Sequence, residues 1–113
     1  STRDDHIALW QGTFKGAQKT SKNVTFVLGE SGHIAGVINP PQANKYGYWF
    51  GPDVTGEPQQ WFDKAKHSKG SWWTHWQKWV TSHNSDKVPA RATHSEDAPG
   101  IYDAPGEYVK VKL

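Results

Sequence analysis

Two residues of types that cooperate in proton transfer, Asp5 and His33, stand 28 positions apart in a chain of 113 residues. A carboxylate can hold one imidazole nitrogen by a hydrogen bond and leave the other nitrogen free to act as a base. His33 lies in the stretch GESGHIAGVINPP, which Pro40 and Pro41 close. Spacing alone does not pair the two residues, because an aspartate and a histidine this far apart are usually unrelated surface residues.

The elements around these residues predict how a fold would bring them together. Apolar residues at positions 7, 10, 14 and 17 recur at helical spacing, so residues 6–19 are expected to form a helix. Residues 23–28 (NVTFVL) predict a short strand buried on both faces. A further strand is expected to end near Arg3. Asp5 and His33 would then follow the carboxyl ends of two adjacent parallel strands, where open α/β sheets gather functional groups.

The middle of the chain predicts a long loop followed by two short helices. Residues 29–45 form the loop, in which Pro40-Pro41 forbids a helix. Pro58 opens a helix expected over 58–68. Ser71 is expected to be the N-cap of a second helix over 72–83.

The remaining segments give weaker signals. YGYWF is expected to be a short strand or an aromatic plug. Residues 84–105 are polar and contain three prolines, which predicts an extended surface arm. The terminal GEYVKVKL alternates like a strand. The sequence thus predicts an α/β fold with the order helix, strand, long loop, two short helices and an extended arm.

Two neighbours of the pair compete with it for a chemical role. Asp4 is a second carboxylate that spacing alone does not dismiss. Ser31 lies two residues before His33, but no GxSxG elbow surrounds it, so it is not expected to be a nucleophile.

Metal binding is not expected from the histidines. His67, His75 and His83 recur every eight residues. Only His75 and His83 lie on one expected helix, where they are too far apart to share a metal ion. The HExxH motif is also missing.

The composition excludes several classes of protein. Seven tryptophans and 35% hydrophobic residues argue against general disorder and for a single small domain. A formal net charge of +2 with scattered lysines is too weak to indicate a nucleic-acid partner. The chain has no cysteine for disulfides or thiolate zinc sites, and no apolar run of ~20 residues to span a membrane. Methionine is absent even at position 1, which indicates an excised part of a longer protein.

Trp72, Trp76 and Trp79 fall at i, i+4 and i+7 of the helix expected over 72–83. Such a face requires a large apolar partner surface, either the rest of a longer protein or a partner subunit. The alternative is that the tryptophans stack against sugars or bases.

In combination, the motifs resemble the carboxy-terminal part of class I polyhydroxyalkanoate synthases, the poly-3-hydroxybutyrate-forming enzymes. The resemblance covers nearly the whole chain and is carried by DHI with Trp10, SGHIAGVINPP, PQQW, GSWW-x-x-W-x-x-W and the ending GEYVKVKL. It is weak at YGYWFGPDVTGE and in the arm 84–98. It implies the C-terminal portion of an α/β-hydrolase-type fold, with 1–45 as the catalytic Asp/His region and 46–113 as a helical and extended region.

The resemblance also implies an activity. The family is an acyltransferase that polymerises (R)-3-hydroxyacyl groups from coenzyme A thioesters into polyester, releasing coenzyme A, through a Cys-His-Asp triad. By motif, His33 is expected to be the base and Asp5, rather than Asp4, the triad carboxylate. The family's cysteine lies upstream in a G-x-C-x-G elbow, so this cysteine-free chain is expected to be inactive alone. Ile34 and Ala35 are expected to form a small apolar wall of the acyl pocket.

The implied partners are the (R)-3-hydroxyacyl-CoA substrate, the polyester product and the missing N-terminal part of the enzyme, with a homodimer left open. No cofactor is expected, because the coenzyme A thioester is the substrate. The implied location is the bacterial cytoplasm, at the surface of polyester granules. The alternative function is a non-catalytic, tryptophan-rich module that binds a partner chain, carbohydrate or the granule surface.

Overall fold

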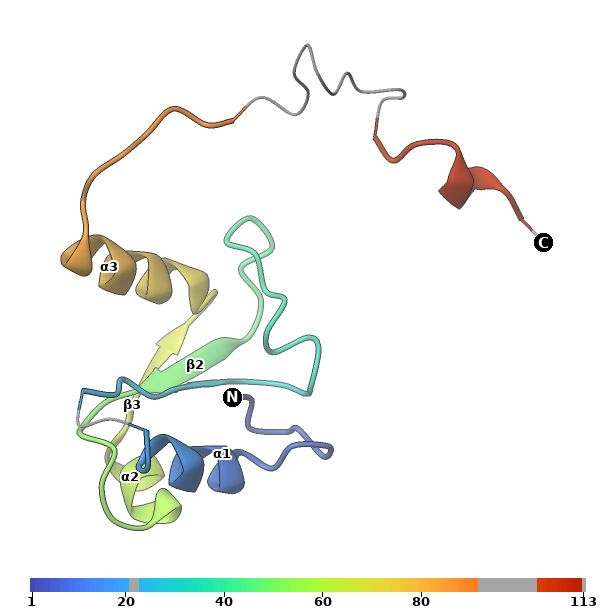
Figure 1. The fold of residues 1–113 in the computed structure, drawn as a ribbon. Coiled ribbons are helices and arrows are strands. Elements are labelled where there is room, and N and C mark those ends of the chain that lie inside the picture. The colour runs from blue at the N-terminus through green and yellow to red at the C-terminus, as the bar shows by residue number, and fades with distance from the viewer. Residues whose placement is uncertain (21–22, 92–103, 113) are drawn as a thin grey trace.

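The computed structural model describes residues 1–20, 23–91 and 104–112, and this part of the chain has a mixed α/β fold. Three helices and a three-stranded sheet form a body from which the C-terminal arm departs (Figure 1). In chain order the elements are α1 (Trp10–Ala17), β1 (Val27–Gly29), β2 (Gly47–Phe50), α2 (Pro58–Lys64), β3 (Lys66–Lys69) and α3 (Trp73–His83).

The sheet has the order β1-β2-β3, and both pairs are antiparallel. The N-terminal segment lies parallel to the other edge of β1. There Gly29 N donates to Ser1 O and Arg3 N donates to Gly29 O, each at 2.8 Å. The parallel strand expected to end near Arg3 is present only as an isolated parallel bridge between Thr2 and Gly29. β2 is antiparallel because the long loop returns the chain to the end of the sheet where β1 finished.

One face of the sheet packs against α1 and α2 and holds the hydrophobic core. Phe14 and Leu28 are fully buried, and Trp61 is 2% exposed. The rings interlock edge-to-face, with centroids 5.1 Å apart both for Phe14 and Phe26 and for Phe26 and Trp61. Trp10 completes this aromatic core. The core fixes β1 and therefore the start of the loop that carries His33.

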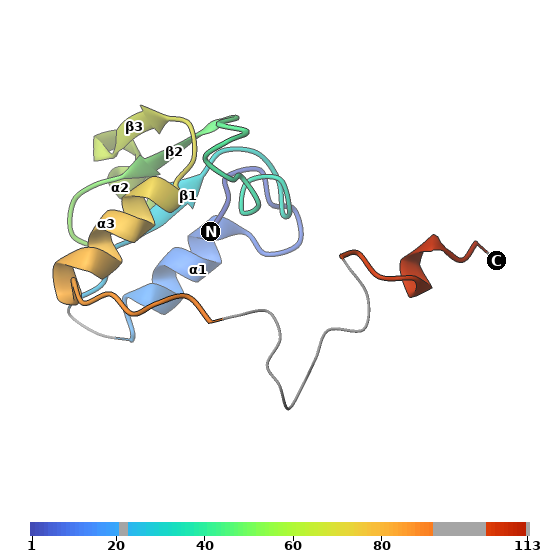
Figure 2. The same cartoon turned by 90° about the horizontal axis from the view of Figure 1, so that it is seen from above.

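α3 lies across the opposite face of the sheet (Figures 1 and 2). His75 stacks against Tyr48 and Phe50, with ring centroids 5.6 and 4.7 Å apart. No residue of α3 is buried in the described part of the chain, and Trp76 and Trp79 are 53% and 43% exposed. The predicted helix is confirmed from Trp73 to His83, but its N-cap is Trp72 and not Ser71 as expected. Much of its tryptophan face is open.

Two elements of the first half are shorter than predicted. The helix expected over 6–19 begins only at Trp10, because the preceding residues form a turn around Asp5. The strand expected over 23–28 is limited to Val27–Gly29. Its burial on both faces is wrong, since Phe26 and Leu28 are buried but Thr25 is exposed.

Three predictions for the second half are corrected or resolved. YGYWF forms a strand rather than a plug. The helix expected over 58–68 ends at Lys64, since Ala65 is extended and KHSK forms β3. The strand expected in GEYVKVKL is a 3-10 turn over Tyr108–Lys110. Part of the predicted arm, residues 92–103, lies outside the described residues.

Candidate active site

Asp5 and His33 meet at the end of β1. His33 Nδ1 lies 2.8 Å from Asp5 Oδ2. The Asp5 side chain is 8% exposed, whereas that of His33 is 47% exposed. The carboxylate is thus buried behind the imidazole, and Nε2 is the ring nitrogen not committed to Asp5. This is the juxtaposition that the predicted elements required.

The Asp5 carboxylate is fixed by its own backbone turn. Asp5 Oδ1 accepts hydrogen bonds from the backbone N–H groups of Ile7 at 2.8 Å and Ala8 at 2.9 Å. The Ala8 bond, followed by the His33 contact, lowers the pKa of Asp5 to about 2. The carboxylate therefore stays charged at neutral pH. A charged acceptor opposite Nδ1 favours the imidazole form that carries its proton there, with Nε2 free as a base.

His33 is carried by a short helical turn. Gly36 N donates to Gly32 O at 3.0 Å, and Ile38 N donates to Ile34 O at 2.8 Å. The first bond spans His33, and the second continues the same turn beyond it. The position of the imidazole therefore depends on how the two ends of the turn are held.

The start of the turn is held by the segment that carries Asp5. Asp4 N donates to Ser31 O at 3.0 Å, and Ser31 adopts the left-handed φ of 76°. Gly36 packs against Thr2 at such close range that a Cβ atom would also lie 2.6 Å from Glu30 O. Glycine at position 36 therefore lets the turn and the N-terminal segment lie side by side.

The exit of the loop is closed by an asparagine that the sequence analysis missed. Asn39 is 3% exposed. Its Oδ1 accepts from Lys45 N at 3.1 Å, and its Nδ2 donates to Lys45 O. A buried amide side chain thus bridges the exit of the loop, just before Pro40 and Pro41. The only sequence signal was an asparagine before proline, which is typical of turns in general.

Asp4 does not share the position of Asp5. Its Oδ1 lies 2.9 Å from Arg3 Nε, and its side chain is 52% exposed. Of the two carboxylates, Asp5 is therefore the one that contacts His33.

The residues predicted to line an acyl pocket lie beside His33 at the surface. Ile34 is 71% exposed, and Ala35 is partly buried. They do not line the apolar groove beside α3. Their role as an apolar wall stays a prediction.

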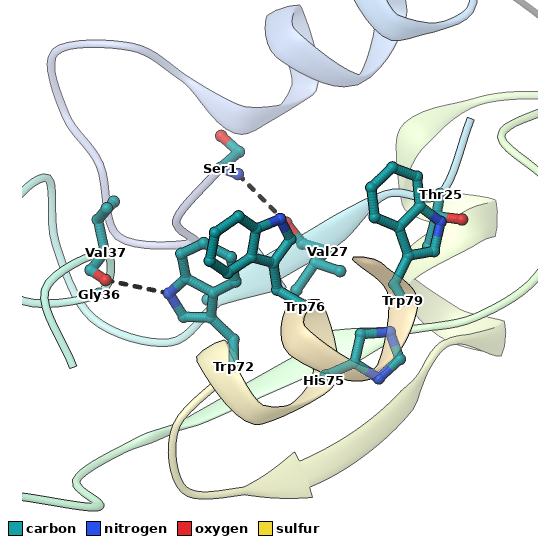
Figure 3. Close-up of a pocket in the computed structure, with 10 residues that line it drawn as sticks. Ser1, Thr25, Val27, Gly36, Val37, Trp72, His75, Trp76 and Trp79 are labelled. Atoms are coloured by element: carbon teal, nitrogen blue, oxygen red, sulfur yellow. Dashed lines mark hydrogen bonds between the residues drawn. The ribbon is translucent and has the colours of Figure 1, made fainter. Parts of the chain in front are cut away.

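A groove of about 340 Å³ lies between α3 and β1, with Ser1 of the N-terminal segment also in its lining (Figure 3). Trp72, Trp76 and Trp79 form its α3 side, and Val27 and Val37 lie opposite. Its wall is therefore mainly apolar, and one end reaches the turn that carries His33.

His67 and His83 are held apart by their different contacts. His67 lies against Trp49, with ring centroids 4.7 Å apart, whereas His83 Nδ1 lies 2.8 Å from the carbonyl oxygen of Trp79. Among the described residues, no three His, Cys, Asp or Glu side chains are grouped to hold a metal ion. No helix in the described ranges has the length and apolar character needed to cross a membrane.

Comparison with known proteins gives one consistent result, although no family model matches the chain. It is 46% identical over 112 residues to "Poly(3-hydroxyalkanoate) polymerase subunit PhaC" of Rhizobium meliloti, covering 99% of this chain and 18% of that protein. It is 40% identical to the PhaC subunit of Cupriavidus necator, and the alignment covers 98% of this chain and 19% of that protein. It is 36% identical to poly(3-hydroxyalkanoate) polymerase 1 of Ectopseudomonas oleovorans, and the alignment covers 94% of this chain and 19% of that protein. The chain is therefore homologous to poly(3-hydroxyalkanoate) polymerases over nearly its whole length, and it spans about a fifth of theirs.

Proposed function

We propose that this chain is the part of a poly(3-hydroxyalkanoate) polymerase that carries the base and the carboxylate of a Cys-His-Asp triad, His33 and Asp5. The observation that carries the proposal is the 2.8 Å contact between His33 Nδ1 and the buried Asp5 Oδ2, in a chain homologous to these polymerases. In this proposal residues 1–45 are the Asp/His region, and 46–113 the C-terminal region, of an α/β-hydrolase-type catalytic domain.

The first step of the proposed reaction transfers the acyl group to a cysteine in another part of the polymerase. His33 Nε2 takes the thiol proton, and the thiolate attacks the carbonyl carbon of the (R)-3-hydroxyacyl-CoA thioester. The bond from that carbon to the coenzyme A sulfur breaks, and the imidazolium returns the proton to the departing thiolate. Because Asp5 remains charged, it stabilises the imidazolium formed between the two proton transfers.

The second step extends the polyester. His33 Nε2 accepts the proton of a 3-hydroxyl group, whose oxygen attacks the acyl-cysteine carbonyl. An ester bond forms, the carbon–sulfur bond to cysteine breaks, and the cysteine sulfur recovers the proton. One base serves both steps, which requires that Nε2 be accessible. The 47% exposure of the His33 side chain supports this requirement.

The proposal extends to the acyl group itself. Ile34 and Ala35 follow the base directly, and Ile34 presents an exposed apolar side chain beside it. An acyl chain held at His33 would contact this wall. Ala35→Leu in the full-length polymerase is then expected to narrow the range of accepted acyl lengths, as measured by competition between short and longer substrates. An unchanged range would remove the wall from the proposal.

The triad roles are tested in the full-length polymerase that contains this segment, by measuring coenzyme A release. His33→Ala is expected to lower kcat by about 10³-fold or more, and Asp5→Asn by about 10²- to 10⁴-fold. Asp4→Asn is the matched control and is expected to stay within about threefold of the parent, because Asp4 pairs with Arg3. The 113-residue chain alone is expected to release no coenzyme A. Full activity of the His33→Ala enzyme, folded as judged by circular dichroism, would overturn the proposal.

The same proposal places the protein at the surface of polyester granules in the bacterial cytoplasm. A fluorescent fusion of the full-length protein tests this placement, with cells that store no polyester as the control. Diffuse fluorescence in granule-containing cells would contradict it.

A further inference from the structure

Two tryptophans at the start of α3 hold the far end of the His33 turn. Trp72 Nε1 and Trp73 Nε1 both donate to the carbonyl oxygen of Val37, at 3.1 and 2.9 Å. Figure 3 shows the Trp72 bond crossing one end of the groove. The backbone N–H of Asn39 also donates to this oxygen, at 3.1 Å, so the two indoles share it with one neighbouring backbone donor.

Val37 lies at the end of the turn that carries His33. Val37 N donates to Ile34 O at 3.0 Å, so Val37 belongs to the turn itself. The other end is held where Asp4 N donates to Ser31 O. The turn is thus fixed at one end by the segment that carries Asp5 and at the other by α3.

Burial of apolar side chains does not hold this turn. Ile34 and Ile38, which could have anchored it, are 71% and 61% exposed. Its position therefore depends on its hydrogen bonds, and the two indole bonds are its side-chain bonds to α3 among the described residues.

The indoles themselves stand on a rigid base. Ser71, immediately before them, is 3% exposed, and its N–H donates to Asn44 Oδ1 at 3.3 Å. Ser71 Oγ accepts from Trp73 N at 3.2 Å, and Gly70 N donates to Tyr46 O at 2.9 Å. The start of α3 is therefore tied to the end of the long loop, just before β2, and the two indoles that bind Val37 stand on a fixed base.

We infer that Trp72 and Trp73 are positioning residues, which hold the Val37 carbonyl and thereby keep His33 aligned with Asp5. The catalytic consequence rests on the proposed function. Since the two indoles share one acceptor, loss of one leaves the other in place, and only loss of both releases Val37 from α3. A displacement of about 1 Å at a catalytic group can cost about 100-fold in rate.

The test uses the full-length polymerase with Trp72→Phe, Trp73→Phe and the double variant, since phenylalanine keeps an aromatic ring and removes the donor. Each single variant is expected to lower kcat for coenzyme A release about threefold. The double variant is expected to lower it about 10- to 100-fold, with KM changed less than twofold. Trp76→Phe, one helical turn away, is the matched control and is expected to leave kcat unchanged.

A second readout separates positioning from general structure. The double variant is also combined with Asp5→Asn, in which His33 has already lost its charged partner. In that background the alignment of His33 with Asp5 no longer raises kcat. The indole substitutions are therefore expected to lower kcat less than threefold there. If the two indole substitutions lowered kcat by the same factor with Asp5 and with Asn at position 5, their role would be merely structural, and the inference would be overturned.

The remaining outcomes are also decisive. If the double variant does not fold, as judged by circular dichroism, the single variants carry the test, and losses no larger than that of Trp76→Phe overturn the inference. The His33→Ala enzyme is measured in the same series. If it is active, the proposed function fails. If it is inactive while the folded double variant keeps its kcat, the positioning inference alone fails.

Discussion

The two faces of the sheet use the same residue type in opposite ways. On the α1 and α2 side, Trp10 and Trp61 are 5% and 2% exposed within a closed aromatic core. On the α3 side, Trp76 and Trp79 are 53% and 43% exposed above an open groove. Apolar burial therefore stabilises the first face, whereas ring stacking and specific hydrogen bonds attach α3 to the second.

The candidate site lies where these two faces meet. β1 belongs to the closed core through Leu28, and the His33 turn that follows it reaches α3 through Val37. The position of His33 thus depends on a well-packed element at one end and on polar contacts at the other. The comparison teaches that core packing alone does not position the base.

The largest expected effect is on the closed face. Trp61→Ala is expected to lower the free energy of unfolding by about 3–5 kcal/mol, because it removes a buried ring from the centre of the core. It also removes the bond from Trp61 Nε1 to Pro52 O, which is 3.1 Å long. Urea unfolding of the 113-residue chain, followed by far-ultraviolet circular dichroism, measures the change. A loss below about 1 kcal/mol would contradict the contrast between the two faces.

A smaller effect is expected at the contact between the His33 turn and the N-terminal segment. Gly36→Ala is expected to cost about 1–3 kcal/mol, because the new Cβ would press against Thr2 and Glu30 O. Gly12→Ala in α1 is the matched control. It has open space around it and is expected to stabilise the chain by about 0.5–1 kcal/mol through helix propensity. The same urea unfolding experiment compares them, and equal effects at both positions would show that this contact is loose.

Acidification measures how much the charged Asp5 carboxylate contributes to the stability of the folded chain. The pKa of Asp5 is lowered from 3.8 to about 2 in the folded chain, so its charged form adds stability above pH 3.8, and this is lost as pH falls towards 2. The urea midpoint is therefore expected to fall between pH 5 and pH 2, and Asp5→Asn is expected to remove part of that fall. Asp4→Asn is the control, with a smaller change expected because that carboxylate is more exposed to solvent. An identical pH dependence in the Asp5→Asn and parent chains would contradict the buried contact.

The smallest effect is expected on the open face. Trp79→Ala is expected to change the free energy of unfolding of the 113-residue chain by less than about 1 kcal/mol, because no residue of α3 is buried. Side by side with Trp61→Ala, this measures the difference between the two faces directly. A cost above about 2 kcal/mol would show that α3 is more tightly packed in solution than the open groove implies.

Local pattern was sufficient where a single segment dictates its own structure. The helices over 72–83 and near 10–17 followed from apolar spacing, and the buried side of β1 from its aromatic and β-branched residues. The placement of Asp5 and His33 near each other followed from the order of a parallel neighbour, a helix and a strand.

Local pattern failed where distant residues determine the structure. KHSK has no apolar alternation, and it forms β3 because β2 offers it a hydrogen-bonding edge. The bonds from Trp72 and Trp73 to Val37 join residues 35 and 36 positions apart, and nothing in either segment signals the other. Asn39 likewise gains its role only when the loop closes on Lys45.

The unequal burial of the tryptophans gives the chain an intrinsic optical reporter. Trp10 and Trp61 lie in an apolar medium, so their fluorescence is expected at shorter wavelengths and protected from iodide. Trp76 and Trp79 meet water, so they emit at longer wavelengths and are quenched first. Anything that covers the groove on α3 will shift this second population towards the blue and shield it from iodide. The state of the open face can therefore be followed in solution without attaching any dye.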